Sequence, residues 1–427
     1  MEYEVKNMKI NRNTLMANIG LEKESLRVDG NGRLAQTPHP FPGDSHLDVD
    51  FSTNQMEFIT GIHSSPSEVY DAMVKLHRKA RTLLRNRETG PEYLWPFSNP
   101  PYIESDRENP PMQFTGANAW KTEYRNHLRE RYGTRLMLYS GIHFNFSFTE
   151  EFWKDAFPGL SSEELGVKRN AAYLNLSAWA TRYAWLVVYL FAASSVLDPS
   201  FFAPDDPNRE NIDKYASPRC SEIGYWNTFE PVLDYSDLES YVNSILRYTE
   251  EGALMYPAEL YYPVRLKPAG AYDMEALREE GVNHIEIRII DENPYSEIGI
   301  CREDIQFLHI LMVYLMYQEP TPFPETKQRQ ALRDMKQAAV YDDSECLSNG
   351  RSIRRNAKCA LHGMEGFFRK GAFTEVERKY IREALDFQWK KFEPGMRRAE
   401  RVRRDFGKGY MEKGVEVAKD MHPLIQN

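Results

Sequence analysis

Four segments of the chain alternate between apolar and polar residues, the pattern of β-strands that bury one face. In residues 283–290, three isoleucines alternate with His284, Glu286 and Arg288, so the charged side chains project from one face. A sheet of such strands has one apolar face on the core and one polar face. The segments are residues 20–28 (GLEKESLRV), 46–60 (HLDVDFSTNQMEFIT), 139–148 (YSGIHFNFSF) and 283–290 (NHIEIRII).

Other segments repeat apolar residues at helical spacing. Ser65 and Glu68 form a capping-box arrangement that predicts a helix after Ser65. Thr374 and Glu377 form a second one, opening a helix that we expect to end near Pro394. Since strands and helices do not alternate regularly, the pattern favours an α+β fold with an antiparallel sheet. Further helices are predicted at residues 118–131, 163–196 and 302–317.

Composition narrows the class of protein. Of 427 residues, 41% are hydrophobic and 27% charged, as in ordinary globular domains. The net charge of −9 argues against a nucleic-acid binder, and the most apolar stretch, residues 183–197, reads as a buried helix too short to cross a bilayer. The N-terminal residues lack a signal-peptide core and the four cysteines show no CxxC spacing. We therefore expect a cytoplasmic protein with no membrane partner.

The polar positions of the four predicted strands are rich in carboxylates. Any one strand alone fits an ordinary sheet with one solvent-exposed face, but faces that together carry five carboxylates and one imidazole favour a shared site. Crowded carboxylates repel one another unless cations lie between them, and oxygen ligands with one imidazole suit Mg²⁺ or Mn²⁺. No GxxxxGK[ST] loop and no GxGxxG after a strand is present. The candidate ligands are Glu22, Glu24, Asp50, Glu57, His143 and Glu286.

Six segments, in order along roughly the first 300 residues, carry a family resemblance. They are residues 20–28 (GLEKESLRV), 50–60 (DFSTNQMEFIT), 124–133 (YRNHLRERYG), 140–147 (SGIHFNFS), 259–263 (ELYYP) and 285–299 (IEIRIIDENPYSEIG). Together they resemble the proteobacterial-type glutamate–cysteine ligases. Several long segments in the same order are far more specific than one short motif.

The resemblance implies a fold and a reaction. It implies a glutamine-synthetase-like core, in which a curved antiparallel sheet forms a funnel with helices packed outside. We expect one catalytic domain over residues 1–427, with the active-site sheet in 1–320 and a mainly helical part in 321–427. The implied reaction joins the γ-carboxylate of L-glutamate to the α-amine of L-cysteine with ATP as co-substrate. It passes through γ-glutamyl phosphate, uses Mg²⁺ (or Mn²⁺), is the first step of glutathione biosynthesis and needs no obligatory protein partner.

The resemblance also implies roles for individual residues. The six candidate ligands match metal-binding positions, and Glu286 and Arg288 match the catalytic centre, although Arg288 also fits a structural ion pair with Glu286. Arg125 would bind the carboxylate of the acceptor amino acid. Tyr139 stands where an aliphatic residue is expected, which could alter the choice of acceptor. The implied substrate-binding residues are Phe51, Tyr124, Arg125, Leu128, Tyr139, Arg219, Tyr225 and Tyr261.

Three alternatives remain open at this point. The first is a γ-glutamyl ligase of the same chemistry that uses a different amine or amino acid as acceptor. The second is a non-catalytic binding protein on the same fold, and the third is a kinase that makes ADP without an acceptor amine. The residues that contact the nucleotide are unassigned. Arg351, Arg354 and Arg355 fit either phosphate contacts or a solvated basic face.

Overall fold

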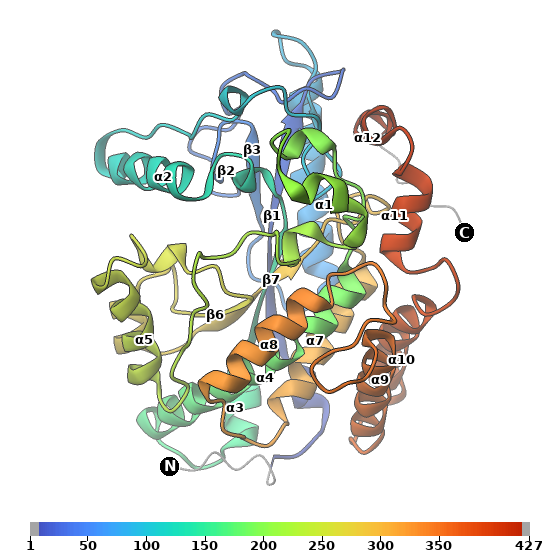
Figure 1. Ribbon diagram of the computed structural model, residues 1–427. Coiled ribbons are helices and arrows are strands. Elements are labelled where there is room, and N and C mark those ends of the chain that lie inside the picture. The colour runs from blue at the N-terminus through green and yellow to red at the C-terminus, as the bar shows by residue number, and fades with distance from the viewer. Residues whose placement is uncertain (1–7, 421–427) are drawn as a thin grey trace.

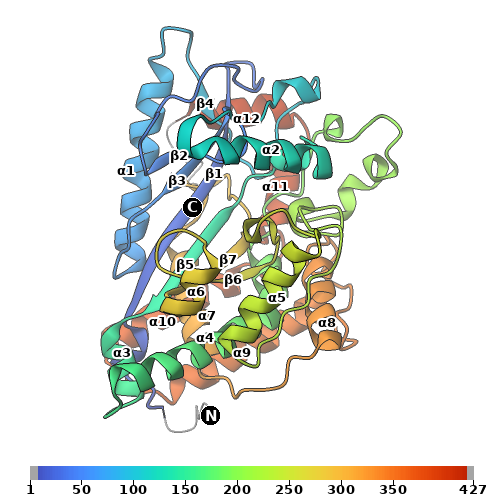
Figure 2. The ribbon, with the colours of Figure 1, turned by 90° about the vertical axis from the view of Figure 1, so that its left-hand side faces the viewer.

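The alternating segments form strands of one antiparallel sheet in the computed structural model, which describes residues 8–420. The strands are β1 (Ala17–Val28), β2 (Leu47–Val49), β3 (Gln55–Ile59), β4 (Tyr93–Leu94), β5 (Ile142–Phe148), β6 (Val264–Lys267) and β7 (His284–Ile290). Their order across the sheet is β2-β3-β1-β5-β7-β6, with β4 paired to the end of β1. Figure 2 shows β1 and β5 side by side through the molecule.

The apolar side chains of the strands lie on the face that the helices cover. Phe144 and Phe146 of β5 and Ile285 and Ile287 of β7 are at most 1% exposed. Helix α1 packs on β1 and β3, α4 on β6 and β7, and α7 on β5. In Figure 1, α1 lies to the right of the strands and α2 to their left. The helices of this region are α1 (Pro66–Arg85), α2 (Ala119–Tyr132), α4 (Ser162–Phe191) and α7 (Arg302–Met316).

The remaining helices surround this core. They are α3 (Glu150–Ala156), α5 (Leu238–Glu250), α6 (Met274–Glu280), α8 (Glu325–Gln337), α9 (Ile353–Arg369), α10 (Glu375–Lys390), α11 (Arg398–Phe406) and α12 (Tyr410–Lys419). Every named strand precedes α7, and α8 to α12 follow it. Side chains of α7, α9 and α10 share one apolar core with the sheet. The antiparallel sheet with helices packed on it confirms the predicted α+β class.

One capping prediction is confirmed in full and the other in part, and one helix end is wrong. Thr374 and Glu377 form a capping box. Ser65 is the N-cap and its hydroxyl accepts from the Glu68 amide, but the Glu68 carboxylate accepts from Ser64, so the reciprocal bond of a capping box is missing. Helix α4 ends at Phe191, not at 196, and so the apolar stretch 183–197 is only partly helical. The reason is that the following amides bond elsewhere: Ala193 N donates to Asp291 Oδ2 at 3.0 Å.

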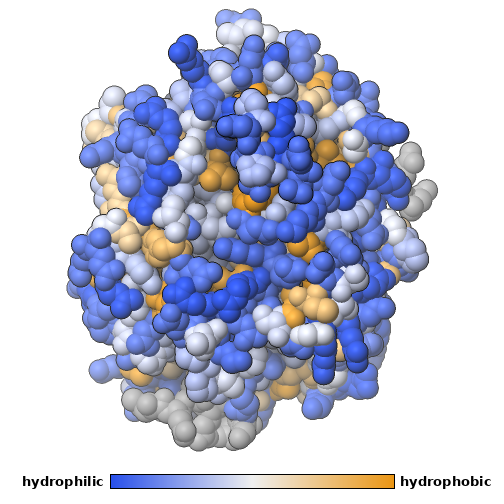
Figure 3. Space-filling view, viewed as in Figure 1, coloured by the Kyte–Doolittle hydropathy of each residue, from blue (hydrophilic) through white to orange (hydrophobic). Residues whose placement is uncertain are grey.

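The surface agrees with the composition. Figure 3 shows a mostly hydrophilic face on which apolar residues appear in separate small areas. Within residues 8–420, we find no helix with both the length and the apolar character that crossing a membrane requires. All four cysteines are free thiols.

Candidate active site

Strand pairing brings the predicted metal ligands together. In the register of the sheet, Glu22 of β1 stands opposite His143 of β5, and Glu24 of β1 stands opposite Glu57 of β3. Glu286 of β7 stands opposite Asn145 of β5, so four neighbouring strands contribute to one polar face. The polar faces of these strands therefore do converge on one site.

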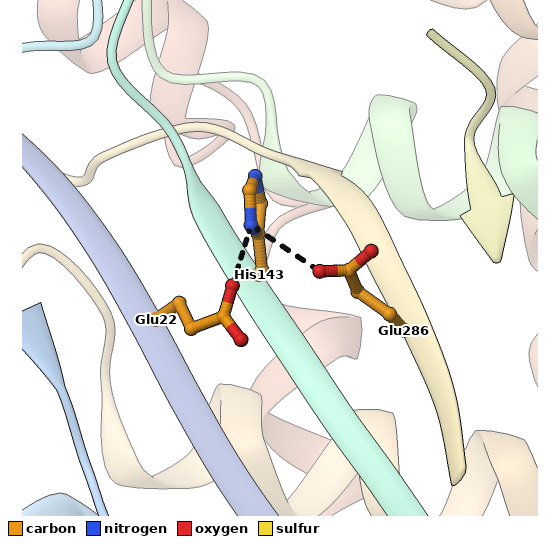
Figure 4. Close-up of side chains that lie close together, drawn as sticks. All are labelled: Glu22, His143 and Glu286. Carbon is orange, nitrogen blue, oxygen red and sulfur yellow. Dashed lines mark hydrogen bonds and ion pairs between the residues drawn. The ribbon is translucent and has the colours of Figure 1, made fainter. Parts of the chain in front are cut away.

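Glu22, His143 and Glu286 form the tightest group (Figure 4). His143 Nδ1 lies 3.1 Å from Glu22 Oε2 and 3.6 Å from Glu286 Oε1, and one ligand atom from each residue lies within 4.8 Å of the others. On the other edge of the imidazole, His143 Nε2 is 3.7 Å from Glu24 Oε1. Asn145 Nδ2 donates to Glu22 Oε1 at 3.0 Å and holds that carboxylate in place.

Cations already balance part of this group. Arg288 Nη1 lies 3.1 Å from Glu286 Oε2, and Lys267 Nζ lies 3.4 Å from Glu286 Oε1 and 3.7 Å from Glu22 Oε1. Burial raises the pKa of Glu286, but Arg288 and Lys267 outweigh it and hold that pKa well below its usual range. Burial is likewise outweighed at Glu22, where His143 and Lys267 bring the pKa to about 2. Both carboxylates are therefore ionised at neutral pH.

A second acidic group on the same face lacks such partners. Burial, followed by the charge of Asp50, raises the pKa of Glu24 to about 8, against weaker opposing effects of Arg219 and Arg288. Burial and the charges of Glu22 and Asp50 raise the pKa of Glu57 well above its usual range. These carboxylates cannot all ionise together without an added positive charge.

The residues fit a divalent metal ion. The donor set is carboxylate oxygen with one imidazole nitrogen, which suits Mg²⁺ or Mn²⁺. Burial raises the pKa values of Glu24 and Glu57 most, and the charges of Asp50 and Glu22 raise them further; a bound cation would offset both effects. Lys267 was not among the predicted site residues. Its signal was the alternation of VRLK in β6, which places Arg265 and Lys267 on the face opposite Val264 and Leu266.

A cavity extends from the acidic face toward aromatic side chains. The rings of Tyr225 and Tyr261 are 4.0 Å apart between centroids, and the Tyr225 hydroxyl donates to Met137 Sδ at 3.4 Å. Phe51, Tyr124 and Leu128 belong to the same apolar cluster as these two tyrosines. The predicted site residues on the wall of the cavity are Glu24, Asp50, Tyr139, His143, Arg219, Tyr225, Tyr261 and Arg288.

Arg125 lies close to the pocket but is engaged with main chain. Its Nε donates to the Asp50 carbonyl at 2.6 Å, its Nη2 donates to the carbonyls of Asp50 and Val49, and its guanidinium lies 4.5 Å from the centre of the Phe114 ring. These bonds tie α2 to the turn after β2. The clamp on the acceptor carboxylate remains a prediction for this residue.

Arg219 reaches the cavity from the short 3₁₀ helix Pro218–Cys220. Its Nη2 donates to the Arg288 carbonyl at 2.6 Å, and its Nη1 lies 4.0 Å from Asp291 Oδ1. The guanidinium packs against Gly141, where a Cβ atom would lie 2.1 Å from Nη2. The Gly141 amide also donates to Glu24 Oε2 at 2.8 Å, so this glycine contacts both sides of the site.

Tyr139 is a buried wall of the cavity, 4% exposed. Its ring packs on Phe201 with centroids 4.8 Å apart. Among the described residues its hydroxyl has no hydrogen-bond partner, although it is fully buried. A buried hydroxyl without a partner can serve a polar group of a bound ligand.

In the basic segment 351–355, Arg354 pairs with Asp343 at 3.2 Å, which gives this arginine a role in the fold.

The chain belongs to the glutamate–cysteine ligase family, whose model matches residues 4–257 and 249–338. The glutathione biosynthesis bifunctional protein GshAB of Listeria welshimeri is 33% identical over 325 residues, 73% of this chain and 41% of that protein. GshAB of Enterococcus faecalis is 35% identical over 314 residues, 71% of this chain and 40% of that protein. The chain thus spans about two fifths of the length of these relatives.

Solved structures support the same fold. The glutamate–cysteine ligase of Francisella tularensis in complex with AMP superposes with a TM-score of 0.83 at 20% identity, covering 99% of this chain and 89% of that one. A bifunctional glutathione synthetase from Pasteurella multocida gives a TM-score of 0.81 at 22% identity, covering 95% and 52%. At these identities the likeness concerns the fold.

Proposed function

We propose that the chain joins the γ-carboxylate of L-glutamate to the α-amine of L-cysteine, with ATP converted to ADP and phosphate. The product would be γ-glutamylcysteine, the first intermediate of glutathione biosynthesis. The observation that carries this proposal is the group Glu22, His143 and Glu286 with Arg288 beside it, opening into an aromatic-walled cavity on the sheet of a glutamate–cysteine ligase family member.

The reaction proceeds in two steps of group transfer. An oxygen of the γ-carboxylate attacks the terminal phosphorus of ATP, the bond to ADP breaks, and γ-glutamyl phosphate forms. The amine nitrogen of the acceptor then attacks the acyl carbon, and phosphate leaves with the transferred oxygen. Mg²⁺ or Mn²⁺ held by the acidic face would neutralise the triphosphate.

The protein's own residues orient and balance the reacting groups. Arg288 is half-buried, with 19% of its side chain exposed, and Glu286 holds its guanidinium at 3.1 Å and keeps it charged, so it presents donors to a phosphoryl group without reorganisation. The hydrogen bonds of Glu22 to His143 and Asn145 fix the carboxylate that faces them. The aromatic side chains around the pocket would help to keep water away from an acyl phosphate.

Arg219 and Arg125 are the proposed carboxylate-binding residues for the amino-acid substrates, and the aromatic residues would enclose a small side chain. The buried hydroxyl of Tyr139 would face that side chain. We also propose that residues 1–427 act as one catalytic domain, since the core of the sheet continues into α9 and α10. A cytoplasmic location fits the four free thiols.

Isotope transfer and an acceptor panel test the proposal. With oxygen-18 in the γ-carboxylate of glutamate, we expect one labelled oxygen in the released phosphate. ADP release should need Mg²⁺ or Mn²⁺, glutamate and an amine, with cysteine among the best acceptors of a panel that includes 2-aminobutyrate, alanine, serine and larger amines. Product without label transfer would exclude the acyl phosphate. Strong preference for a large or carboxylate-free amine would replace cysteine by another acceptor.

A further inference from the structure

Helix α2 carries three of the predicted acceptor-site residues but has little apolar surface to fix its position. Of its 14 residues, only Leu128 is buried. Within the described chain, the named elements that pack most closely on it are the short 3₁₀ helices Gly116–Asn118 and Leu136–Leu138, which flank it in sequence. In Figure 1 it lies on the left, on the other side of the strands from α1. Polar contacts therefore add to the apolar contacts of Tyr124, Leu128 and Tyr132 in holding this helix over the pocket.

One buried carboxylate, Glu259, makes three of these contacts and holds the C-terminal half of α2, while Arg125 ties its N-terminal half to the turn after β2. Its Oε2 lies 3.1 Å from His127 Nε2, and its Oε1 accepts from the Tyr132 hydroxyl at 2.8 Å and lies 3.3 Å from Arg131 Nη1. The Met255 amide donates to Oε2 at 2.7 Å. Three of the four partners belong to the C-terminal half of α2, and the Glu259 side chain is 0% exposed.

Glu259 is also joined to the opposite wall of the pocket. Asn227 Nδ2 donates to the Glu259 carbonyl at 2.8 Å and to the Tyr132 hydroxyl at 3.0 Å. The Tyr261 amide donates to Asn227 Oδ1 at 2.8 Å, and the rings of Tyr132 and Tyr261 are 5.3 Å apart. One network thus connects α2 with the two segments that carry the pocket tyrosines at 225 and 261.

We propose that Glu259 is a positioning residue that holds α2 over the acceptor pocket and so sets the affinity for the acceptor amino acid. The inference rests on the proposed ligase function. A carboxylate suits this task because its two oxygens accept from four donors at once, including two potential cations. Glutamine has the same shape but replaces one acceptor oxygen by an amide that donates, and it leaves Arg131 without its counter-charge.

Glu259→Gln should therefore loosen α2 without disturbing the acidic face of the sheet. We expect KM for cysteine and for 2-aminobutyrate to rise about 10- to 100-fold, the size of effect that loss of one charge-assisted hydrogen bond to the acceptor produces. KM for ATP, the affinity for Mn²⁺ and kcat at saturating acceptor should stay within about twofold of wild type, since the Glu22 group does not contact Glu259. Amide hydrogen exchange should rise over residues 119–132.

Two further variants sharpen the test. Tyr132→Phe removes one hydroxyl from the network but keeps the ring beside Tyr261, so it should raise the acceptor KM less, and its effect should not add to that of Glu259→Gln. The Tyr132→Phe variant also tests the proposal if the Glu259→Gln variant does not fold. Glu123→Gln removes the same charge from an exposed position of α2 and should leave both KM values unchanged.

Equilibrium binding of 2-aminobutyrate by calorimetry, with glutamate and a non-hydrolysable ATP analogue present, separates this inference from the proposed reaction. If the wild type binds 2-aminobutyrate but releases no ADP in the separate assay with ATP, the proposed reaction is overturned. Weaker binding by the Glu259→Gln and Tyr132→Phe variants would then still support the positioning role of Glu259. Unchanged acceptor binding and KM in both variants would overturn the positioning role. A proportional rise of the KM values for ATP and for the acceptor would also overturn the positioning role. If the wild type does not bind 2-aminobutyrate, both the proposed reaction and the positioning role are overturned.

Discussion

Gly141→Ala should displace the Arg219 guanidinium from the active site. Gly141 is not among the glycines with positive φ, so alanine strains no backbone there. The obstacle is Arg219, because the new Cβ would lie 2.1 Å from Nη2 and 2.4 Å from Cζ. The guanidinium must retreat by about 1.3 Å to restore an ordinary contact of 3.4 Å. That movement breaks its 2.6 Å hydrogen bond to the Arg288 carbonyl.

The magnitude follows from the bond that is lost. A hydrogen bond from a charged group contributes about 1.5–3 kcal/mol. If Arg219 holds a substrate carboxylate from this position, the same energy corresponds to a fall in kcat/KM of about 10- to 150-fold. The assay is ADP release with ATP, glutamate and cysteine, with the concentration of each substrate varied in turn.

A double-mutant cycle decides whether Arg219 transmits the effect. In the Arg219→Met background there is no guanidinium to displace, so Gly141→Ala should add little to the loss caused by the first change. Gly366→Ala is the control, since this glycine of α9 has nothing within 4 Å of its added Cβ and should keep full activity. Equal effects of Gly141→Ala in both backgrounds would refute the reasoning.

Three further predictions concern the metal, pH and stability. Glu286→Gln should weaken Mn²⁺ binding at least about 10-fold, measured by electron paramagnetic resonance, and unchanged binding would exclude Glu286 as a ligand. In metal-free protein, Glu24 has a pKa of about 8 when folded and near 4.5 when unfolded. The protonated form of Glu24 therefore stabilises the fold below pH 4.5, and this contribution is lost as the pH rises to 8. The melting temperature should fall over this pH range, and the fall should be smaller in the Glu24→Gln variant. Asp304→Asn leaves Lys391, which follows α10, and Arg398 of α11 without their shared carboxylate and should cost about 3–5 kcal/mol in urea unfolding, whereas Asp386→Asn on the exposed side of α10 should cost almost nothing.

Alternation along the strands was enough to predict the polar face. Because side chains repeat every two residues, Glu22 and Glu24 had to share a face, and so did Glu286 and Arg288. The pairing of β1 with β5 was not predictable in this way, since it joins residues about 120 positions apart and depends on packing of the apolar faces against α1 and α7. The family resemblance, and not the periodicity, predicted that these strands meet at one site.

Contacts between side chains and the main chain were the feature that the sequence predicted least. The hydrogen bonds of Arg125 to the carbonyls of Val49 and Asp50 could not be predicted, because no residue type indicates the shape of the turn after β2. Gly141 and Arg219 are 78 positions apart, and only their folded contact explains why a side chain at 141 is excluded. Helix α4 was predicted too long because the amides after Phe191 find tertiary acceptors that no local pattern shows.

Charge balance divides the acidic face into two halves with different needs. Glu22 and Glu286 are ionised, because Lys267, Arg288 and the imidazole of His143 offset their burial. Glu24, on the same strand as Glu22, and Glu57, on the neighbouring β3, have raised pKa values because they are buried beside other carboxylates, and among residues 8–420 only His143, beside Glu24, lies within ion-pair distance of either. An added divalent cation therefore changes protonation mainly in the second half, and metal binding near pH 7 should release protons from there. Proton release measured in weakly buffered solution should fall in Glu24→Gln and persist in Glu22→Gln; the reverse order would contradict this division of the site.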